Sequence, residues 1–482
     1  MNKEKKYFYI TTTLPYVNSD PHVGFAMELI RADAIARFKK QQGYDVFFNT
    51  GTDEHGQKIQ QKAEEQSRGT QEYVDEYAAK FRGLKEALGI LDDVHFIRTT
   101  DAYHMKAAQE FWKVCDANGF IYKKPYKIKY CVGCELEKTE SELDENGRCL
   151  LHPNLEIELI DEENYFFKWS EFQGKLLEFY DAHPGFVVPE SRFNEIRKFV
   201  KRGLEDFSIS RLKEKMSWGV PVPDDEAHVM YVWFDALVNY ISTLGWPDNL
   251  EKFEAYWKQG ETVQYAGKDN LRQQSAMWQA MLMAAGLPPT KRIVVEGFIT
   301  SGGTKMSKSL GNVINPYDVV AEYGTDAFRY YCLRELSPFE DSDMTMDKFK
   351  ESYNANLANG LGNLVNRVMK MAETNLDAPI EARDEGFSAD YKKAFENFNI
   401  QEAANIIWAR IGEVDKTIQE LQPFKLVKDF PLQAKEIIGG LVQQVYSIGK
   451  LLEPFMPETS AAIFAAIDSN KMPEKPLFMR KD

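Results

Sequence analysis

The N-terminal residues alternate between a strand pattern and a helix pattern, and this alternation limits the possible folds more than any other feature of the chain. Residues 7–12 are all aromatic or β-branched, as in a buried strand. Asp20 and Pro21 then supply a helix N-cap and a first helical residue, and apolar residues recur at helical spacing up to Gly43. Residues 46–50 return to the strand pattern. This order predicts a βαβ unit, and therefore a parallel sheet that binds its ligand at the carboxyl ends of its strands.

The composition is that of an ordinary globular protein. The 482 residues carry 59 Lys and Arg against 74 Asp and Glu, a formal net charge of −15, and 44% of the residues are hydrophobic. These values exclude disordered and fibrous classes, and at about 150 residues per domain the length suggests about three domains. An acidic chain is not expected to coat nucleic acid, although a local basic face can still dock one RNA.

The sequence gives no sign of export or membrane insertion. No apolar run reaches the ~20 residues that a membrane span needs, and the first residues lead into no signal-peptide core. Five cysteines in a chain of this length do not make a disulfide scaffold. We therefore expect a cytoplasmic protein with no membrane partner.

Beyond the first unit, the pattern predicts an α/β domain that an insertion interrupts, followed by a helical domain. Residues 231–234 and 292–295 have strand patterns, and a helix pattern covers residues 273–285 between them. A cysteine-bearing segment with short mixed elements precedes these, and from about residue 350 the chain is almost wholly helical by periodicity.

Two short motifs have the chemistry of a triphosphate site. His22 and Gly24 lie in the first turn of the first predicted helix, where free backbone N–H groups attract anions. His22 can donate to a phosphate oxygen, and Gly24 would let a nucleotide lie against the backbone. Lys305 and Lys308 follow a glycine pair, on a loop that could close over a triphosphate and neutralise developing charge. Each motif alone is weak, since a capping histidine and a solvated loop are the ordinary explanations.

A third motif has the spacing of a zinc knuckle. Cys131 and Cys134 form a CxxC turn, and fourteen residues later Cys149 and His152 form a CxxH turn. Three thiolates and an imidazole are a tetrahedral set that structural zinc prefers, and four protein ligands leave no open position for catalysis. The alternative is a knuckle of reduced thiols that packs without metal.

The joint occurrence of these motifs, in this order, resembles the class I aminoacyl-tRNA synthetases. The segments between them are similar to the methionyl-tRNA synthetase family, and the resemblance runs from about residue 7 to about residue 460. It is carried by Thr13–Tyr16, Gly51–Gly56, Tyr231–Ala236 and Gly267–Asp269, besides the lysine loop. The aliphatic synthetases for Leu, Ile and Val share the fold, but the insertion here is too short for their editing domain.

The resemblance implies a fold and an activity. The fold is a class I, Rossmann-like parallel sheet, split by a connective insertion with a zinc knuckle and followed by an α-helical bundle. The activity is a methionine–tRNA ligase, which forms methionyl-adenylate from ATP and L-methionine with Mg²⁺ and transfers methionine to tRNA(Met). The expected domains are the catalytic domain in two halves (1–115 and 226–300), the insertion (116–225), the lysine loop with a stem-contact region (301–349) and the anticodon-binding domain (350–482). We also expect a monomer, because no appended C-terminal dimerisation or tRNA-binding domain is apparent.

The resemblance also assigns roles to single residues. Leu14 and Tyr240 would address the methionine sulfur, Trp233 would pack on the side chain, and Asp53 would hold the ammonium group. The expected methionine-binding residues are Leu14, Tyr16, Asp53, Trp233, Tyr240 and Gln274. The expected ATP-binding residues are His22, Gly24, Asp269, Gly297, Lys305 and Lys308, of which His22, Gly24, Lys305 and Lys308 would be catalytic.

Asn363, Arg367 and Phe424 resemble the family's anticodon-reading residues. Asn363 and Arg367 stand four residues apart on one predicted helix face, and Phe424 falls where the family usually has Trp. Amide and guanidinium groups can read base edges, and an exposed aromatic ring can stack an unpaired base.

Several positions depart from the family's usual pattern. Phe25 stands where the second His of the first motif often lies, Gln273 and Gln274 replace a Phe-His pair, and Glu296 replaces a His before Gly297. These changes leave open a second reading, a catalytically altered paralogue that binds tRNA or a partner protein.

Overall fold

The computed structural model describes residues 5–134, 136–138, 142–306 and 312–482. The chain forms two compact units, each made of three segments. The first consists of Met1–Pro21, Tyr44–Gly83 and Asp93–Val295, and the second of His22–Gly43, Leu84–Asp92 and Glu296–Asp482. None of the helices in the described part of the chain has the length and hydropathy of a membrane span.

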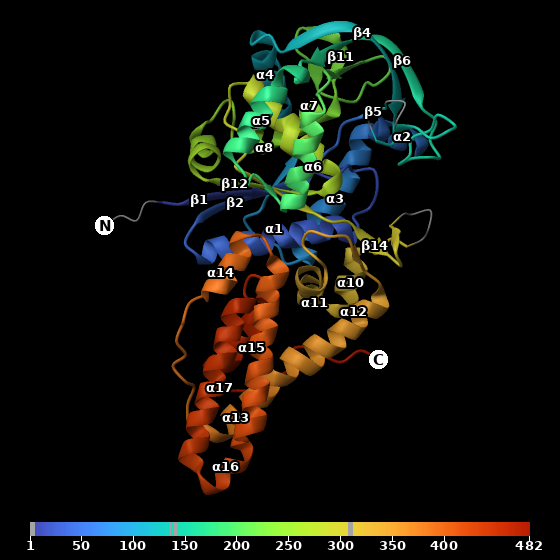
Figure 1. Ribbon diagram of the computed structural model, residues 1–482. Helices are drawn as coiled ribbons and strands as arrows, with labels where there is room; N and C mark the ends of the chain where they lie inside the picture. Colours follow the sequence, from blue (N-terminus) through green and yellow to red (C-terminus); the bar gives the residue numbers. More distant parts are fainter. Residues whose placement is uncertain (1–4, 135, 139–141, 307–311) are drawn as a thin grey trace. The chain divides into compact units, whose positions relative to one another are not determined.

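The predicted parallel sheet is present and has six strands in the order β3-β2-β1-β12-β13-β7. β1 pairs in parallel with β2 and β12, β2 with β3, and β13 with β7. The helix α1 (Val23–Gln41) connects β1 to β2, so the βαβ prediction is confirmed (Figure 1). The strands are β1 (Tyr7–Thr11), β2 (Asp45–Thr52), β3 (His95–Arg98), β7 (Val187–Val188), β12 (Glu261–Gly267) and β13 (Arg292–Glu296).

Three local predictions differ from the structure. Residues 231–234 are not a strand, since the helix α7 (Val232–Ala236) begins there with Tyr231 as its N-cap. A short apolar run has the same pattern in a buried strand and in a helix that is buried on all sides, and α7 lies inside the hydrophobic core. The first helix begins at Val23, with His22 and not Asp20 as N-cap, because the His22 ring takes the capping role. The predicted helix 273–285 is present, although it opens with the π-helix η5 (Gln273–Met277) before α9 (Trp278–Ala284).

The insertion builds two small antiparallel sheets. The long strands β4 (Ile121–Cys131) and β6 (Glu158–Phe167) lie side by side and pair along their length, with β5 (Leu136–Lys138) and β8 (Phe207–Ser208) at the edges (Figure 1). The second sheet contains β9 (Ser210–Leu212), β10 (Pro221–Val222) and β11 (Asp225–Met230). The strand β7 pairs with the main sheet, although its residues lie within the predicted insertion.

Helices and aromatic side chains form the core of the first unit. One continuous cluster of buried residues joins the β1 side chain Tyr9 to Phe111, Phe167, Tyr240 and Trp278. The helices of this unit are α2 (Gln57–Glu65), α3 (Thr70–Ala87, which crosses into the second unit), α4 (Ala102–Ala117), α5 (Gln173–Ala182), α6 (Glu190–Lys201), α7 and α8 (Asn239–Ser242), with η3 (Phe253–Gln259), η5 and α9.

The second unit is mostly helical from residue 346 onward, as predicted for residues from about 350. The helices α13, α15 and α17 lie side by side in a bundle (Figure 1). Phe38 of α1 stacks on Phe395 of α14 with ring centroids 4.1 Å apart. Apart from α1 and the end of α3, the helices of the second unit are α10 (Pro316–Tyr323), α11 (Thr325–Tyr330), η7 (Tyr331–Glu335), α12 (Met346–Ser352), η8 (Tyr353–Gly362), α13 (Asn363–Asn375), α14 (Ala389–Glu396), α15 (Ile400–Leu421), α16 (Pro423–Asp429), α17 (Pro431–Leu452) and α18 (Pro457–Ser469).

Candidate active site

The turn that follows β2 places Asp53 beside the loop that follows β1. The N–H of Asp53 donates to the carbonyl oxygen of Pro15 at 3.0 Å, and its carbonyl oxygen accepts from the N–H of Val17 at 3.3 Å. Tyr16 lies opposite Asp53 in a parallel bridge, and Asp53 is only 2% exposed. The backbones of Tyr16 and the buried Asp53 thus pair just beyond the carboxyl ends of two adjacent strands, where the sheet is expected to bind its ligand.

Aromatic rings continue from this point into the core. The rings of Tyr16 and Trp233 meet edge to face, with centroids 6.3 Å apart and an interplanar angle of 66°. Trp233 packs against the hydrophobic cluster that contains Tyr240, and Leu14 is buried. Flat aromatic walls of this kind suit a flexible thioether side chain.

Gln274 and Tyr240 form a second set of contacts in the same unit. The Gln274 Nε2 donates to the Tyr240 hydroxyl oxygen at 2.5 Å, and the Tyr9 hydroxyl donates to the backbone carbonyl of Tyr240 at 3.0 Å. All three side chains are buried. The hydroxyl of Tyr240 is therefore held in a defined position by the Gln274 amide.

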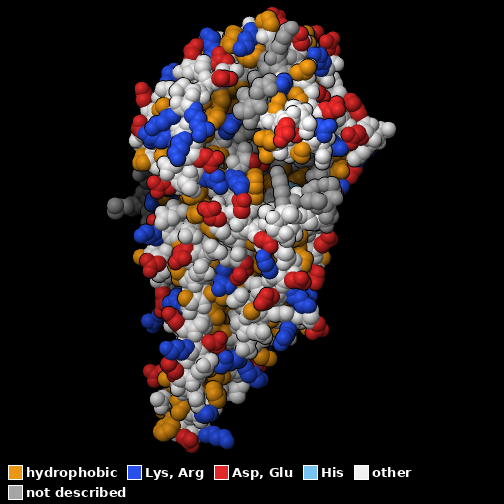
Figure 2. All heavy atoms as spheres, turned by 45° about the vertical axis from the view of Figure 1, so that its right-hand side comes forward, with side chains coloured by type: hydrophobic (Ala, Val, Ile, Leu, Met, Phe, Trp, Pro, Cys, Tyr) orange, Lys and Arg blue, Asp and Glu red, His pale blue; other side chains and the backbone are white. Residues whose placement is uncertain are grey.

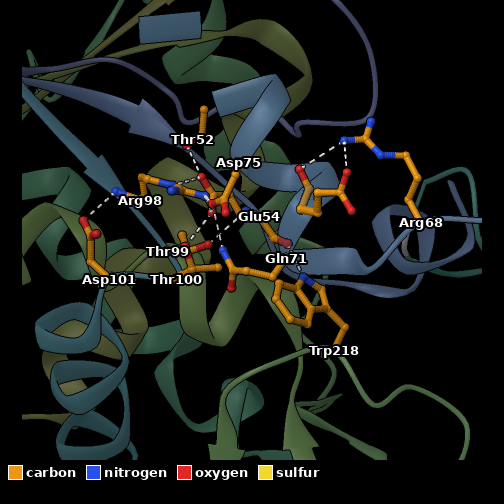
Figure 3. Close-up of polar contacts among 11 residues, drawn as sticks. Thr52, Glu54, Arg68, Gln71, Asp75, Arg98, Thr99, Thr100, Asp101 and Trp218 are labelled. Carbon is orange, nitrogen blue, oxygen red and sulfur yellow. Dashed lines mark hydrogen bonds and ion pairs between the residues drawn. The ribbon is translucent and has the colours of Figure 1, made fainter. Parts of the chain in front are cut away.

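Glu54 is a buried anchor directly after Asp53, and the sequence analysis missed it. Its two carboxylate oxygens accept from Arg98, Nε at 2.6 Å and Nη2 at 2.8 Å, and also from the hydroxyls of Thr52 and Thr100 at 2.6 and 2.5 Å. The N–H of Glu54 donates to the hydroxyl of Thr99 at 2.9 Å. Figure 3 shows these side chains converging on Glu54. The Thr52–Glu54 turn is thereby fixed, and with it the position of Asp53.

Arg98 and Trp218 tie this turn to two further segments. Arg98 also pairs with Asp75 of α3 at 2.6 Å (Figure 3). Partial burial lowers the pKa of Arg98, but the hydrogen bonds to Glu54 and Asp75 outweigh it, and the pKa is raised. The Trp218 Nε1 donates to the carbonyl oxygen of Glu54 at 2.5 Å. Local sequence carries no signal for the role of Arg98, because its partner Glu54 lies 44 residues away.

Two buried histidines hold the carboxylate of Asp235, and the sequence analysis missed this group too. The Asp235 Oδ2 lies 2.7 Å from His55 Nδ1, and its Oδ1 lies 2.9 Å from His104 Nε2. Burial raises the pKa of Asp235, but the charge and hydrogen bonds of the two histidines outweigh it and lower the pKa to about 2. Asp235 lies within one helical turn of Trp233 in α7. The contacts of Asp235 with the two histidines therefore fix α7 relative to the turn that carries Asp53.

His22 caps the helix that the triphosphate motif was predicted to open. Its Nδ1 accepts from the N–H of Gly24 at 3.0 Å. A neutral imidazole that accepts at Nδ1 carries its hydrogen on Nε2, so the outer nitrogen of this exposed ring is a donor. A Cβ on Gly24 would lie 2.8 Å from His22 Cε1. Glycine is therefore required here for the capping contact, in addition to the predicted approach of a nucleotide.

Glu296 forms a buried ion pair within the second unit. Its Oε2 lies 3.1 Å from Nη1 of Arg31, and both side chains are at most 4% exposed. Arg31 also donates to the backbone carbonyls of Cys332, Leu336 and Ser337. The departure at Glu296 is therefore compensated by an arginine. At Gly297, a Cβ would come within 2.2 Å of the carbonyl carbon of Glu340, so a close chain crossing requires glycine.

The remaining predicted ATP-binding residues are divided between the two units. Asp269 lies in η4 (Lys268–Asn270), just after β12, in the first unit. Lys305 ends β15 (Thr304–Lys305), which pairs with β14 (Ile299–Ser301) in the second unit. Lys308 lies outside the described residues.

Cys131, Cys134, Cys149 and His152 meet as predicted. Their ligand atoms all lie within 4.8 Å of one another, and the Cys134 Sγ is 3.5 Å from the Cys149 Sγ and 3.2 Å from His152 Nδ1. Zinc–sulfur bonds of about 2.3 Å in a tetrahedron place sulfur atoms roughly 3.8 Å apart, so the set fits zinc. A Cβ on Gly133 would lie 2.6 Å from the His152 ring, and only glycine allows this approach.

Two of the three predicted anticodon residues, Arg367 and Phe424, line a hollow on the helical bundle. Asn366, Arg367, Lys370, Met371, Ile418 and Phe424 line a space of about 480 Å³. Arg367 pairs with Asp415 of α15 at 2.8 Å, and Phe424 is 54% exposed. Asn363 is exposed one turn before Arg367 but does not line the hollow. Figure 2 shows hydrophobic side chains at the surface of the helical region, interspersed with basic and acidic ones.

A comparison with protein-family models identifies the family to which the chain belongs. The model described as tRNA synthetases class I (M) matches residues 8–149 and 133–369. The chain belongs to this family of class I tRNA synthetases. The predicted fold class, a parallel sheet with an insertion and a helical C-terminal part, is that of the synthetase structures it matches.

Known synthetases match this class I synthetase over nearly its whole length. The methionine–tRNA ligase of Thermotoga maritima is 40% identical over 97% of this chain and 76% of its own, and that of a Nostoc species is 41% identical over 96% and 90%. A structure of Mycobacterium tuberculosis methionyl-tRNA synthetase in complex with methionyl-adenylate is similar with a TM-score of 0.90 and 36% identity. The match covers 98% of this chain and 100% of the M. tuberculosis chain.

Proposed function

We propose that this chain is a methionine–tRNA ligase. It activates L-methionine with ATP to methionyl-adenylate and transfers the methionyl group to the 3′-terminal ribose of tRNA(Met). The observation that carries this proposal is the likeness, over 98% of the chain, to a synthetase bound to methionyl-adenylate. The buried carboxylate and aromatic walls at the sheet edge support it.

Methionine would bind where the loop after β1 meets the turn after β2. The Asp53 carboxylate would take the ammonium group, and Tyr16 and Trp233 would enclose the side chain. Leu14 and the Tyr240 hydroxyl would address the sulfur, with Gln274 behind that hydroxyl. Burial of Asp53 strengthens its attraction for the ammonium group, because little water competes.

Adenylation would need positioning and charge stabilisation but no protein base. The methionine carboxylate attacks the α-phosphorus of ATP, the bond to the bridging oxygen breaks, and pyrophosphate leaves with that oxygen. The His22 Nε2–H and the first turn of α1, with Gly24, would bind phosphate oxygens, and Lys305 and Lys308 would stabilise the leaving pyrophosphate. Asp269 and Gly297 would contact the nucleoside portion. Mg²⁺ bound to the triphosphate would supply further charge neutralisation.

Zinc and tRNA would bind away from the reacting atoms. Cys131, Cys134, Cys149 and His152 would hold a zinc ion with no open coordination position, so its role would be to fold the knuckle. We propose that Asn363, Arg367 and Phe424 contact the anticodon, and that the enzyme acts as a monomer in the cytoplasm, where charged tRNA is used.

A methionine-dependent exchange of labelled pyrophosphate into ATP tests the activity. The second candidate, a catalytically idle paralogue, is favoured only by the departures at Phe25, Gln274 and Glu296. An idle paralogue would bind tRNA without exchange. Exchange that depends on another amino acid would reject both candidates.

A further inference from the structure

A chain of buried amide and hydroxyl groups lies behind Tyr240. Gln264 of β12, Gln274 of η5, Gln279 of α9 and Thr290 before β13 are all at most 1% exposed. Each of these side chains is hydrogen-bonded to at least one of the others. None of these groups titrates in the physiological range, and only Gln274 belongs to the methionine site proposed above.

Two backbone groups fix the direction of this chain. The N–H of Thr290 can only donate, and it donates to the Gln279 Oε1 at 2.9 Å. The carbonyl oxygen of Gln274 can only accept, and it accepts from the Gln279 Nε2 at 2.8 Å. The amide of Gln279 is therefore oriented at both ends, and its Nε2 also donates to the Thr290 hydroxyl at 3.1 Å.

The direction then passes from one side chain to the next. Because the Thr290 hydroxyl accepts from Gln279, its hydrogen donates to the Gln264 Oε1, at 2.5 Å. The Gln264 Nε2 donates to the Gln274 Oε1 at 3.1 Å. The Gln274 Nε2 then donates to the Tyr240 hydroxyl oxygen at 2.5 Å. A phenol oxygen that accepts from an amide directs its own hydrogen elsewhere.

We propose that Gln264, Gln279 and Thr290 are positioning residues that make the Tyr240 hydroxyl a hydrogen-bond donor toward the substrate sulfur. This inference rests on the proposed function, since it takes methionine as the ligand beside Tyr240. A thioether sulfur is only a weak acceptor, so a donor that is held in one direction gives the site its means of telling sulfur from a methylene group. If the side-chain amides of Gln264 and Gln274 were both flipped, Gln274 would present its oxygen to Tyr240. The Tyr240 hydroxyl would then donate to Gln274, and the sulfur would lose its donor.

The test compares methionine with norleucine, which has a methylene in place of the sulfur. The quantity measured is the ratio of kcat/KM for the two amino acids in pyrophosphate exchange. Thr290→Val keeps the shape of the side chain but removes the hydroxyl, so the ratio should fall about three- to tenfold, the scale of one hydrogen bond. Thr290→Ser keeps the hydroxyl and loses only a methyl group, so it should retain the parent ratio.

A packing role for Thr290 would give the opposite order, with the valine variant close to the parent and the serine variant impaired. That order, or equal ratios in both variants, would overturn the proposal. Thr262→Val is the matched control, because it removes a buried threonine hydroxyl of β12 that donates to the backbone carbonyls of η3. Its ratio should not change.

A second variant covers the case in which Thr290→Val does not fold. Gln264→Met keeps the length of the side chain and removes both the acceptor for Thr290 and the donor to Gln274. The methionine-to-norleucine ratio should again fall several-fold, while the KM for ATP stays at the parent value. An unchanged ratio would reject the proposal. A parent enzyme without methionine-dependent exchange would instead reject the proposed function, so the two failures are distinguishable.

Discussion

Three residues of the proposed site each follow the carboxyl end of a strand of the main sheet. Asp53 follows β2, Asp269 follows β12 and Gly297 follows β13. Their side chains or backbones are then fixed by groups far away in the sequence, as Arg98 and the threonines fix Glu54 beside Asp53. Local sequence proposes Asp53 as a site residue, since a known motif contains it, but it does not indicate Arg98, whose role depends on a partner in another element.

At this scale we predict that Lys308→Ala lowers the adenylation rate by roughly 10²–10³, the size of losing one transition-state donor. The lysine would act on the leaving pyrophosphate and not on the amino acid, so the KM for methionine should change little. Single-turnover adenylate formation measures the rate, and Lys475→Ala, an exposed lysine remote in sequence, is the control. An unaltered rate would remove this lysine from the catalytic residues.

At the scale of elements, the zinc knuckle and the helix α11 each depend on the ionisation of a few side chains. The knuckle was predictable because its ligands lie within one short segment, at a spacing that few other structures explain. The helix α7 was mispredicted because a short apolar run is ambiguous until its tertiary neighbours are known. The strand β7 was missed for a related reason, since two residues carry no period.

Chelation should release about one zinc ion per chain and loosen the insertion, because the four ligands hold β4 to the segment before β6. The helical bundle shares none of these ligands, so its far-UV circular dichroism signal should persist. Metal analysis of the purified protein and limited proteolysis of residues 131–158 measure the two effects. Purified protein without zinc, and a knuckle no more sensitive to protease after chelation, would argue for packed free thiols.

Asp326 in α11 should make the second unit less stable as the pH rises. Burial raises the pKa of this carboxyl from 3.8 to about 6, against the opposing hydrogen bond from the Thr459 N–H, a change worth roughly 3 kcal/mol. For an acid with a raised pKa, the stabilising contribution is complete below about pH 4 and is lost as the pH passes 6. Asp326→Asn removes this titration.

The thermal unfolding midpoint, followed by circular dichroism from pH 4.5 to 7.5, measures the effect of Asp326→Asn. The variant should gain several degrees over the parent above pH 6 and lose that advantage near pH 4.5. Asp318→Asn, an exposed position on α10, should follow the parent at every pH. A constant difference between Asp326→Asn and the parent would show that the carboxyl does not titrate in this range.

At the scale of the whole molecule, the proposed methionine-binding and anticodon-binding residues belong to different compact units. The methionine residues all belong to the first unit, whereas Asn363, Arg367 and Phe424 belong to the second. The order of motifs in the sequence predicts the same division of roles. The division of the βαβ unit itself was not visible, because α1 joins the second unit although both of its strands belong to the first.

Mutations in the hollow of the bundle should therefore affect tRNA charging but not pyrophosphate exchange. Arg367→Ala should cost about 1–3 kcal/mol of discrimination between cognate and altered anticodons, the scale of a bidentate base contact. Its ion pair with Asp415 holds the guanidinium at the rim of the hollow. Charging of tRNA transcripts with single anticodon changes measures this, and Arg410→Ala, on α15 but outside the lining, is the control.

Phe424 should act as a stacking platform in the same hollow. Phe424→Ala should weaken tRNA binding by about 1–3 kcal/mol, the scale of one stacked base, whereas Phe424→Trp should be tolerated because it enlarges the stacking surface. The ring is 54% exposed, so its removal leaves no cavity in the core and the protein should stay folded. If Phe424→Ala abolished pyrophosphate exchange as well, the ring would be supporting the fold. If it altered neither reaction, the anticodon would bind elsewhere on the bundle.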